Sequence, residues 1–73
     1  MTLTYRNSLK QINEAIKKSN SYFEERKNSE GIKFYVLRKP VSDDFRDIRD
    51  ICIFYKKSDV AECANQILKY WIS

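Results

Sequence analysis

A single glycine and a single proline, Gly31 and Pro40, are the strongest breakers of regular backbone structure in this chain. Residues 32–39 lie between these two breakers and are rich in β-branched and aromatic residues, which predicts a strand whose successive side chains point to opposite faces. Pro40 cannot donate a hydrogen bond to a neighbouring strand, so the strand is expected to end there. The segments on either side must supply the helices and any further strands.

The segment before Gly31 carries apolar residues at helical spacing, three, four or seven positions apart: Tyr5, Leu9, Ile12, Ile16 and Phe23. This spacing predicts one long helix from Tyr5 to about Lys27. Thr4 is one candidate for its cap, and Ser8 with Gln11 offers a capping box one turn later. Gly31 suits the left-handed residue with which such a helix ends.

The segment after Pro40 is ambiguous. We favour a second strand over residues 46–56, because Ile51 to Tyr55 is β-branched and aromatic and the first strand otherwise lacks a partner. The alternative is a helix, favoured by the helical spacing of Phe45, Ile48, Cys52 and Tyr55. A final helix is predicted from about Asp59 to Ile72, with Asp59 and Glu62 as a capping pair.

These elements predict one two-layer α+β domain over residues 1–73, in the order helix, strand, strand, helix. A two-stranded hairpin alone is marginal in water, so the sheet needs support. Three remedies are open: a third strand from Phe45–Asp50, an extended N-terminal segment that joins the sheet, or strand pairing between two copies. We favour the homodimer. The expected core anchors are Phe34, Phe54 and Trp71.

Most catalytic chemistry is disfavoured by composition. The chain has no histidine, and one glycine cannot form a phosphate-binding loop. Cys52 and Cys63 lack a base and are expected in the core. The acidic residues Asp43, Asp44, Asp47 and Asp50 alternate with Arg46 and Arg49, which indicates ion pairs. We therefore expect no cofactor, no metal site and no enzyme activity, with a metal-independent ribonuclease as the third hypothesis.

The leading hypothesis is a small protein-binding regulator or inhibitor that occludes a partner's surface. Its size is compatible with inhibitors that phages and mobile elements encode against host defences. Surplus tyrosines and mixed surface charge favour this role. Tyr35 and Leu37 belong to an interface if both helices cover the face of Phe34, and to the core if the helices cover opposite faces. The expected contact residues are Tyr35, Leu37, Arg38, Lys39, Asp43, Asp44, Arg46 and Arg49.

The second hypothesis is a nucleic-acid-binding module, RNA or DNA, because the net charge is +4. Its expected contact residues are Lys33, Tyr35, Arg38, Lys39, Lys56 and Lys57. The longest unbroken apolar stretch, Ile51 to Tyr55, is far too short to cross a bilayer. Two cysteines do not make a disulfide framework. We therefore expect a cytoplasmic protein without membrane contact.

Overall fold

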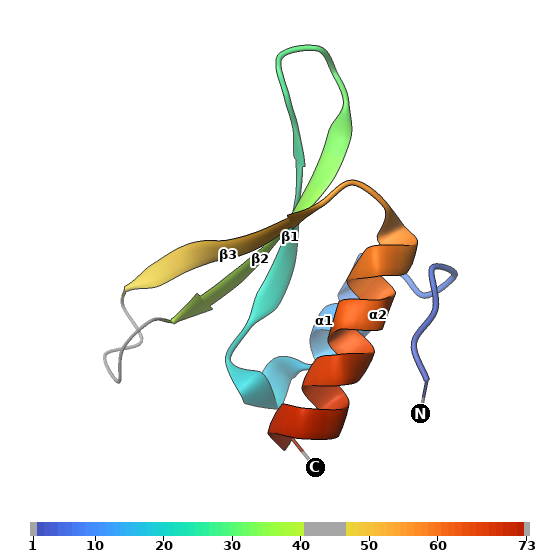
Figure 1. The fold of residues 1–73 in the computed structure, drawn as a ribbon, viewed down its shortest axis with the longest axis vertical. Coiled ribbons are helices and arrows are strands. Elements are labelled where there is room, and N and C mark those ends of the chain that lie inside the picture. The colour runs from blue at the N-terminus through green and yellow to red at the C-terminus, as the bar shows by residue number, and fades with distance from the viewer. Residues whose placement is uncertain (1, 41–46, 73) are drawn as a thin grey trace.

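The structure, a computed structural model, describes residues 2–40 and 47–72, with side chains as far as residue 70. Figure 1 shows two helices beside a three-stranded antiparallel sheet of order β1-β2-β3. The elements, in chain order, are α1 (Leu9–Ala15), a 3-10 turn η1 (Lys17–Ser19), β1 (Tyr22–Lys27), β2 (Lys33–Pro40), β3 (Ile48–Phe54), α2 (Lys57–Ile67) and a π-helical turn η2 (Leu68–Ile72). The α+β class is confirmed, with three strands where the sequence analysis placed two.

The long N-terminal helix is wrong: the α-helix begins at Leu9, one turn after the predicted start at Tyr5, and ends well before Lys27. Ser8 and Gln11 form the predicted capping box: Ser8 Oγ accepts from the Gln11 amide at 3.1 Å, and Gln11 Oε1 accepts from the Ser8 amide at 3.0 Å. The α-helix ends at Ile16, and the chain reverses at Asn20, which has a left-handed φ of 60°. Tyr22 and Phe23 then begin β1. The additional strand of the sheet, β1, thus comes from the second half of the predicted helix, a source that none of the three remedies named.

Gly31 does have a positive φ, of 82°, but it serves a hairpin and not a helix end. The turn between β1 and β2 is held by Asn28, whose side-chain oxygen accepts from the amides of Glu30 at 2.9 Å and Ile32 at 3.0 Å. The hairpin closes with Lys27 opposite Lys33. It projects beyond the helices, as Figure 1 shows at the top of the molecule.

The core lies between the sheet and the two helices. It consists of Leu3, Ile12, Ile16, Phe23, Leu37, Val60, Ala61, Ala64 and Ile67. Because Phe23 pairs with Leu37, and Tyr35 with Phe54, the helices cover the face that carries Tyr35 and Leu37. Phe34 lies on the other face. Strand alternation separates the two faces of a strand but does not say which one the helices cover, so the face expected in the core was wrong.

The third strand confirms the favoured interpretation of residues 46–56, within narrower bounds. Because β3 runs to Phe54, only Tyr55 and Lys56 remain before α2 begins. Lys56 is the N-cap residue and makes no capping side-chain bond, so the predicted capping pair of Asp59 and Glu62 is wrong. Over residues 2–40 and 47–72, no helix is long and apolar enough to cross a membrane.

Candidate functional site

The outer edge of β1 is closed by a side chain from α1. Asn13 accepts a hydrogen bond from the Phe23 amide at 2.8 Å and donates one to the Phe23 carbonyl at 3.0 Å. Its carboxamide thus occupies the place of a neighbouring strand at Phe23. The rest of this edge carries charged side chains, which discourage pairing with another chain. Asn65 holds the backbone of Leu3 in the same two-bond way, at 2.8 Å for each bond.

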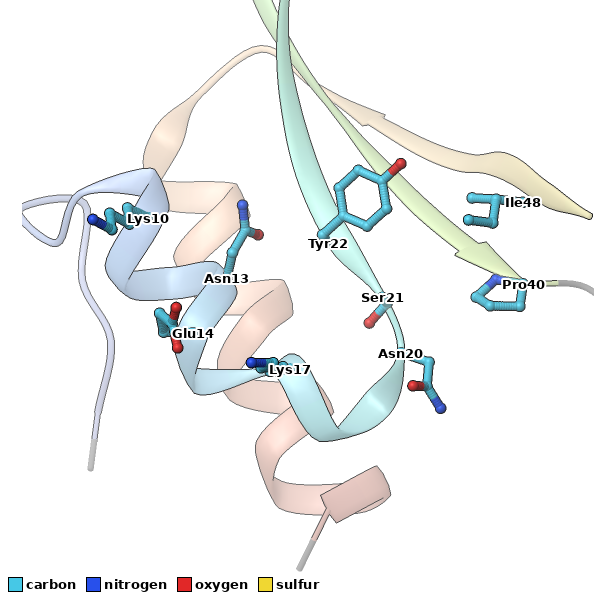
Figure 2. Close-up of a pocket in the computed structure, with 9 residues that line it drawn as sticks. All are labelled: Lys10, Asn13, Glu14, Lys17, Asn20, Ser21, Tyr22, Pro40 and Ile48. Carbon is cyan, nitrogen blue, oxygen red and sulfur yellow. The ribbon is translucent and has the colours of Figure 1, made fainter. Parts of the chain in front are cut away.

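An open groove of about 650 Å³ lies between α1, η1 and the start of β1 (Figure 2). Two of the side chains that line this groove already make hydrogen bonds within the protein. Asn13 holds Phe23, and the Tyr22 hydroxyl accepts from Arg38 Nη1 at 3.3 Å. Its rim carries Lys10, Lys17 and Glu14, a mixture of both charges. We therefore place the candidate site elsewhere.

Among the described residues no strand pairs with the outer edge of β3, and this edge is apolar from Ile51 to Tyr55. Ile51, Ile53 and Tyr55 expose 48%, 57% and 67% of their surfaces, and β3 is exposed from Arg49 to Ile53. We define the β3 edge surface as Ile51, Cys52, Ile53, Tyr55 and Tyr70. Contiguous exposed apolar side chains on an edge strand are typical of a surface that another chain covers.

Alternation of the backbone shows which amide this edge presents. Phe23 turns its amide and carbonyl outward to Asn13, so Leu37, opposite it, turns toward β3. Cys52, opposite Leu37, turns back toward β2. The next residue, Ile53, therefore directs its amide and carbonyl away from the sheet.

A groove of about 270 Å³ continues this surface beneath β3, toward α2. Its lining includes Ile51 and Cys52 from the strand, and Cys63, Ile67 and Tyr70 from the helical side. Cys52 is exposed, contrary to the core position expected for it, whereas Cys63 is half-buried against the core. Burial, with a smaller effect of Cys52, raises the pKa of the Cys63 thiol. Both thiols therefore lie at the apolar groove.

The opposite face of the sheet carries a charge network that joins all three strands. Arg26 on β1 contacts Glu24 and Asp50, each at 3.0 Å. Arg38 on β2 has its Nε 3.0 Å from Asp50 Oδ1, an ion-pair distance without the alignment of a hydrogen bond. Val36 is 1% exposed yet separate from the core, because it lies among these charged side chains. The paired charges make this face a structural surface.

We define the basic cluster as Lys27 and Lys33 of the β1–β2 hairpin and Lys57 of α2, which all act on the carboxyl group of Glu25. Lys33 Nζ lies 2.8 Å from Glu25 Oε1 and is the largest cause of a lowered pKa at Glu25. Lys27 and Lys57 lower the pKa of the same carboxyl further through their charges. Three lysines from three elements thus lower the pKa of one carboxyl group.

The structure does not bring the expected protein-contact residues together. Leu37 is buried, Tyr35 is half-buried against the core, and Arg38 is held in the charge network. Lys39 is half-buried at the groove beneath β3. Arg49 is exposed and pairs with Asp47 at 3.3 Å. Three of the expected contacts lie outside the described residues: Asp43, Asp44 and Arg46.

The nucleic-acid contact set is also divided between surfaces. Lys33 lies in the basic cluster, with Lys56 and Lys57 at the start of α2. Arg38 lies on the opposite face of the sheet. Lys39 lies at the far end of β2 from Lys33.

The expected contact residues include neither Ile53 nor Tyr55, although Tyr55 is one of the surplus tyrosines. Their signal was present in the longest apolar stretch, which the sequence analysis used only to predict a strand and to exclude a membrane span. An unbroken apolar run is typical of a strand that is buried on both faces. That these side chains are exposed is known only from the place of β3 in the folded sheet. No protein-family model matches this chain, and neither a curated protein nor a solved structure matches it.

Proposed function

We propose that this chain is a small protein-binding regulator or inhibitor that acts by covering a partner's surface and not by catalysis. The single observation that carries the proposal is the open, apolar β3 edge surface, at the opposite side of the sheet from the β1 edge that Asn13 occupies. An edge strand with outward amides binds an extended segment through backbone hydrogen bonds, and adjacent apolar side chains provide the selectivity. In this arrangement the partner extends the sheet beyond β3.

The groove beneath β3 supports the same proposal. A strand placed beside β3 would direct alternate side chains into the groove lined by Cys52, Cys63 and Ile67. The side chains between them would meet Ile53 and Tyr55 on the other face. Both faces of the added strand therefore find apolar contacts.

Affinity capture with matched variants tests the proposal. Wild-type protein, Ile53→Lys and Ile32→Lys are used as bait in a cell lysate, and the captured proteins are identified by mass spectrometry. Ile32 is a suitable control because it is 49% exposed but lies in the β1–β2 turn. We expect Ile53→Lys to lose a stoichiometric partner that Ile32→Lys retains. A partner retained by both variants would contradict the proposed surface.

A second candidate function, nucleic-acid binding, is supported by the basic cluster. Lys27 and Lys33 are cross-strand partners, and like charges placed directly opposite each other destabilise a hairpin. With Lys57 nearby they exceed the charge of Glu25, which favours an anionic ligand such as a phosphate backbone.

A gel-shift titration in increasing salt tests this candidate with duplex and single-stranded probes. Binding is expected to weaken as salt rises, and Lys57→Glu should reduce the salt dependence by about one unit of slope for one lost phosphate contact. Lys18→Glu is the control, because Lys18 lies in η1 at the other end of the molecule. No shift at low salt would eliminate nucleic-acid binding.

A further inference from the structure

We propose that the β3 edge surface also binds a second copy of this chain, so that two β3 strands pair antiparallel in a closed dimer. The inference rests on the proposed function, because it assigns a second occupant to the same surface. It makes self-pairing a competitor of partner binding. The dimer would hold the apolar edge covered until a partner displaces one copy.

The first argument is the composition of β3. The run Ile51 to Tyr55 is uncharged, whereas the beginning of the strand carries Arg49 and Asp50. A two-fold axis at Ile53 sets this run against the same run of the second copy. The charged beginning then lies beyond the paired segment, and Asp50 keeps its contacts with Arg26 and Arg38.

The second argument is the outward direction of the Ile53 amide and carbonyl. Two residues that face each other across a two-fold axis can exchange both of these bonds only if both point outward. Ile53 meets this condition, and its exposed side chain would lie against Ile53 of the second copy. The interface is therefore isologous, with the same residues contributed by each copy.

The third argument explains why association stops at two copies. Pairing through both β3 edges leaves the two β1 edges at the ends of the extended sheet. Each is occupied at Phe23 by Asn13 and carries charged side chains along the rest of the strand. A sheet that is open at one edge and closed at the other forms a dimer and not a fibre.

Sedimentation velocity measures this directly, with wild-type protein from about 1 μM to about 1 mM. We expect a concentration-dependent change from monomer to dimer. Ile53→Lys should weaken dimerisation roughly 100-fold or more, because it sets two like charges opposite each other at the axis. Ile32→Lys should dimerise as the wild type does, and circular dichroism checks that each variant is folded.

Cross-linking provides a measurement that does not depend on a destabilised variant. Residues opposite each other in a hydrogen-bonded pair have Cα atoms about 5.5 Å apart, within the range of a disulfide. In a Cys52→Ala, Cys63→Ala background, Ile53→Cys should form an intermolecular disulfide with glutathione disulfide as oxidant. Ile32→Cys in the same background should not.

The outcomes separate the inference from the proposed function. A wild-type monomer at every concentration, or a dimer indifferent to Ile53→Lys, overturns the inference. If the monomer still loses its captured partner through Ile53→Lys, the inference alone fails. If a dimer forms through Ile53 while partner capture ignores that residue, the proposed function alone fails.

Discussion

The two outer strands of this sheet differ in what lies against their outward backbone groups and in the side chains that they expose. On β1, Asn13 binds the amide and carbonyl of Phe23, and charged side chains occupy the rest of the strand. On β3, the Ile53 amide and carbonyl point outward and the exposed side chains are apolar. Both strands belong to the same sheet, yet within residues 2–40 and 47–72 only β1 has a side chain from a helix in place of a neighbouring strand.

The two strands also differ in how much they contribute to the stability of the fold. Phe23 contributes its ring to the core, where it is 1% exposed and meets the Phe54 ring edge-on at a centroid distance of 6.0 Å. Ile53 contributes almost nothing to that core. We infer that β1 holds the fold together, and that the outer side of β3 is retained for contact with another chain.

The largest predicted difference between the two strands is the cost of removing an apolar side chain. Phe23→Ala should lower the free energy of unfolding by about 3–5 kcal/mol, because it leaves a cavity in the core. Ile53→Ala should lower it by less than about 1 kcal/mol, because more than half of this side chain is exposed. Urea unfolding measures both.

A chain of this size has a small total stability, so Phe23→Ala could unfold completely. Phe23→Leu is the milder substitution, with a loss of about 1.5 kcal/mol. Equal losses for Phe23→Leu and Ile53→Ala would refute the division between the two strands.

The next largest effect concerns the two hydrogen bonds between Asn13 and the backbone of Phe23. Asn13→Ala removes both bonds to the Phe23 backbone and should cost about 1–3 kcal/mol. It also opens the β1 edge. At high concentration we therefore expect species larger than a dimer, detected by light scattering.

Asn65→Ala is the matched control for this variant. Asn65 makes the same two bonds to Leu3, which is not part of the sheet. A similar loss of stability without larger species is expected. If both variants aggregate alike, general destabilisation and not the open edge is responsible.

The smallest effect is the pH dependence of the network that ties β3 to β1. The hydrogen bond from Arg26, aided by Arg38, lowers the pKa of Asp50 in the folded state. Its stabilising contribution is therefore fully present above the unfolded pKa of about 3.9 and is lost as pH falls through the lower folded value. Because Asp50 is solvent-exposed and Arg26 is only half-buried, the change is small.

Urea unfolding between pH 7 and pH 2 should show this contribution. Asp50→Asn should flatten the acid part of the stability profile relative to the wild type. Asp47→Asn is the control, because Asp47 contacts only the neighbouring exposed Arg49 among the described ion pairs. Parallel profiles for the wild type and Asp50→Asn would argue against the network.

Local signals predicted the elements whose neighbours in sequence decide their conformation. The capping box of Ser8 and Gln11 and the end of β2 at Pro40 are such cases. The single error with the widest effect was the extension of the first helix to Lys27. Phe23 fits the helical spacing as well as a strand, and only its pairing with Leu37 decides between them.

The candidate site was harder to predict because it depends on position in the sheet. Whether Ile53 is buried or exposed depends on which face of the sheet the helices cover, and no local pattern marks that face. The role of Asn13 needs the approach of α1 to β1, and no local pattern marks it. Tyr35 and Leu37 were placed correctly on a shared face, but only the packed helices show that this face is the core.

Residue-resolved hydrogen exchange of the two edge amides is the most direct test of the difference between the edges. In dilute protein, the Phe23 amide should exchange slowly because Asn13 binds it, and the Ile53 amide should exchange rapidly. As concentration rises, Ile53 should become protected while Phe23 remains unchanged. An Ile53 amide as protected as that of Phe23 in dilute solution would contradict an open β3 edge.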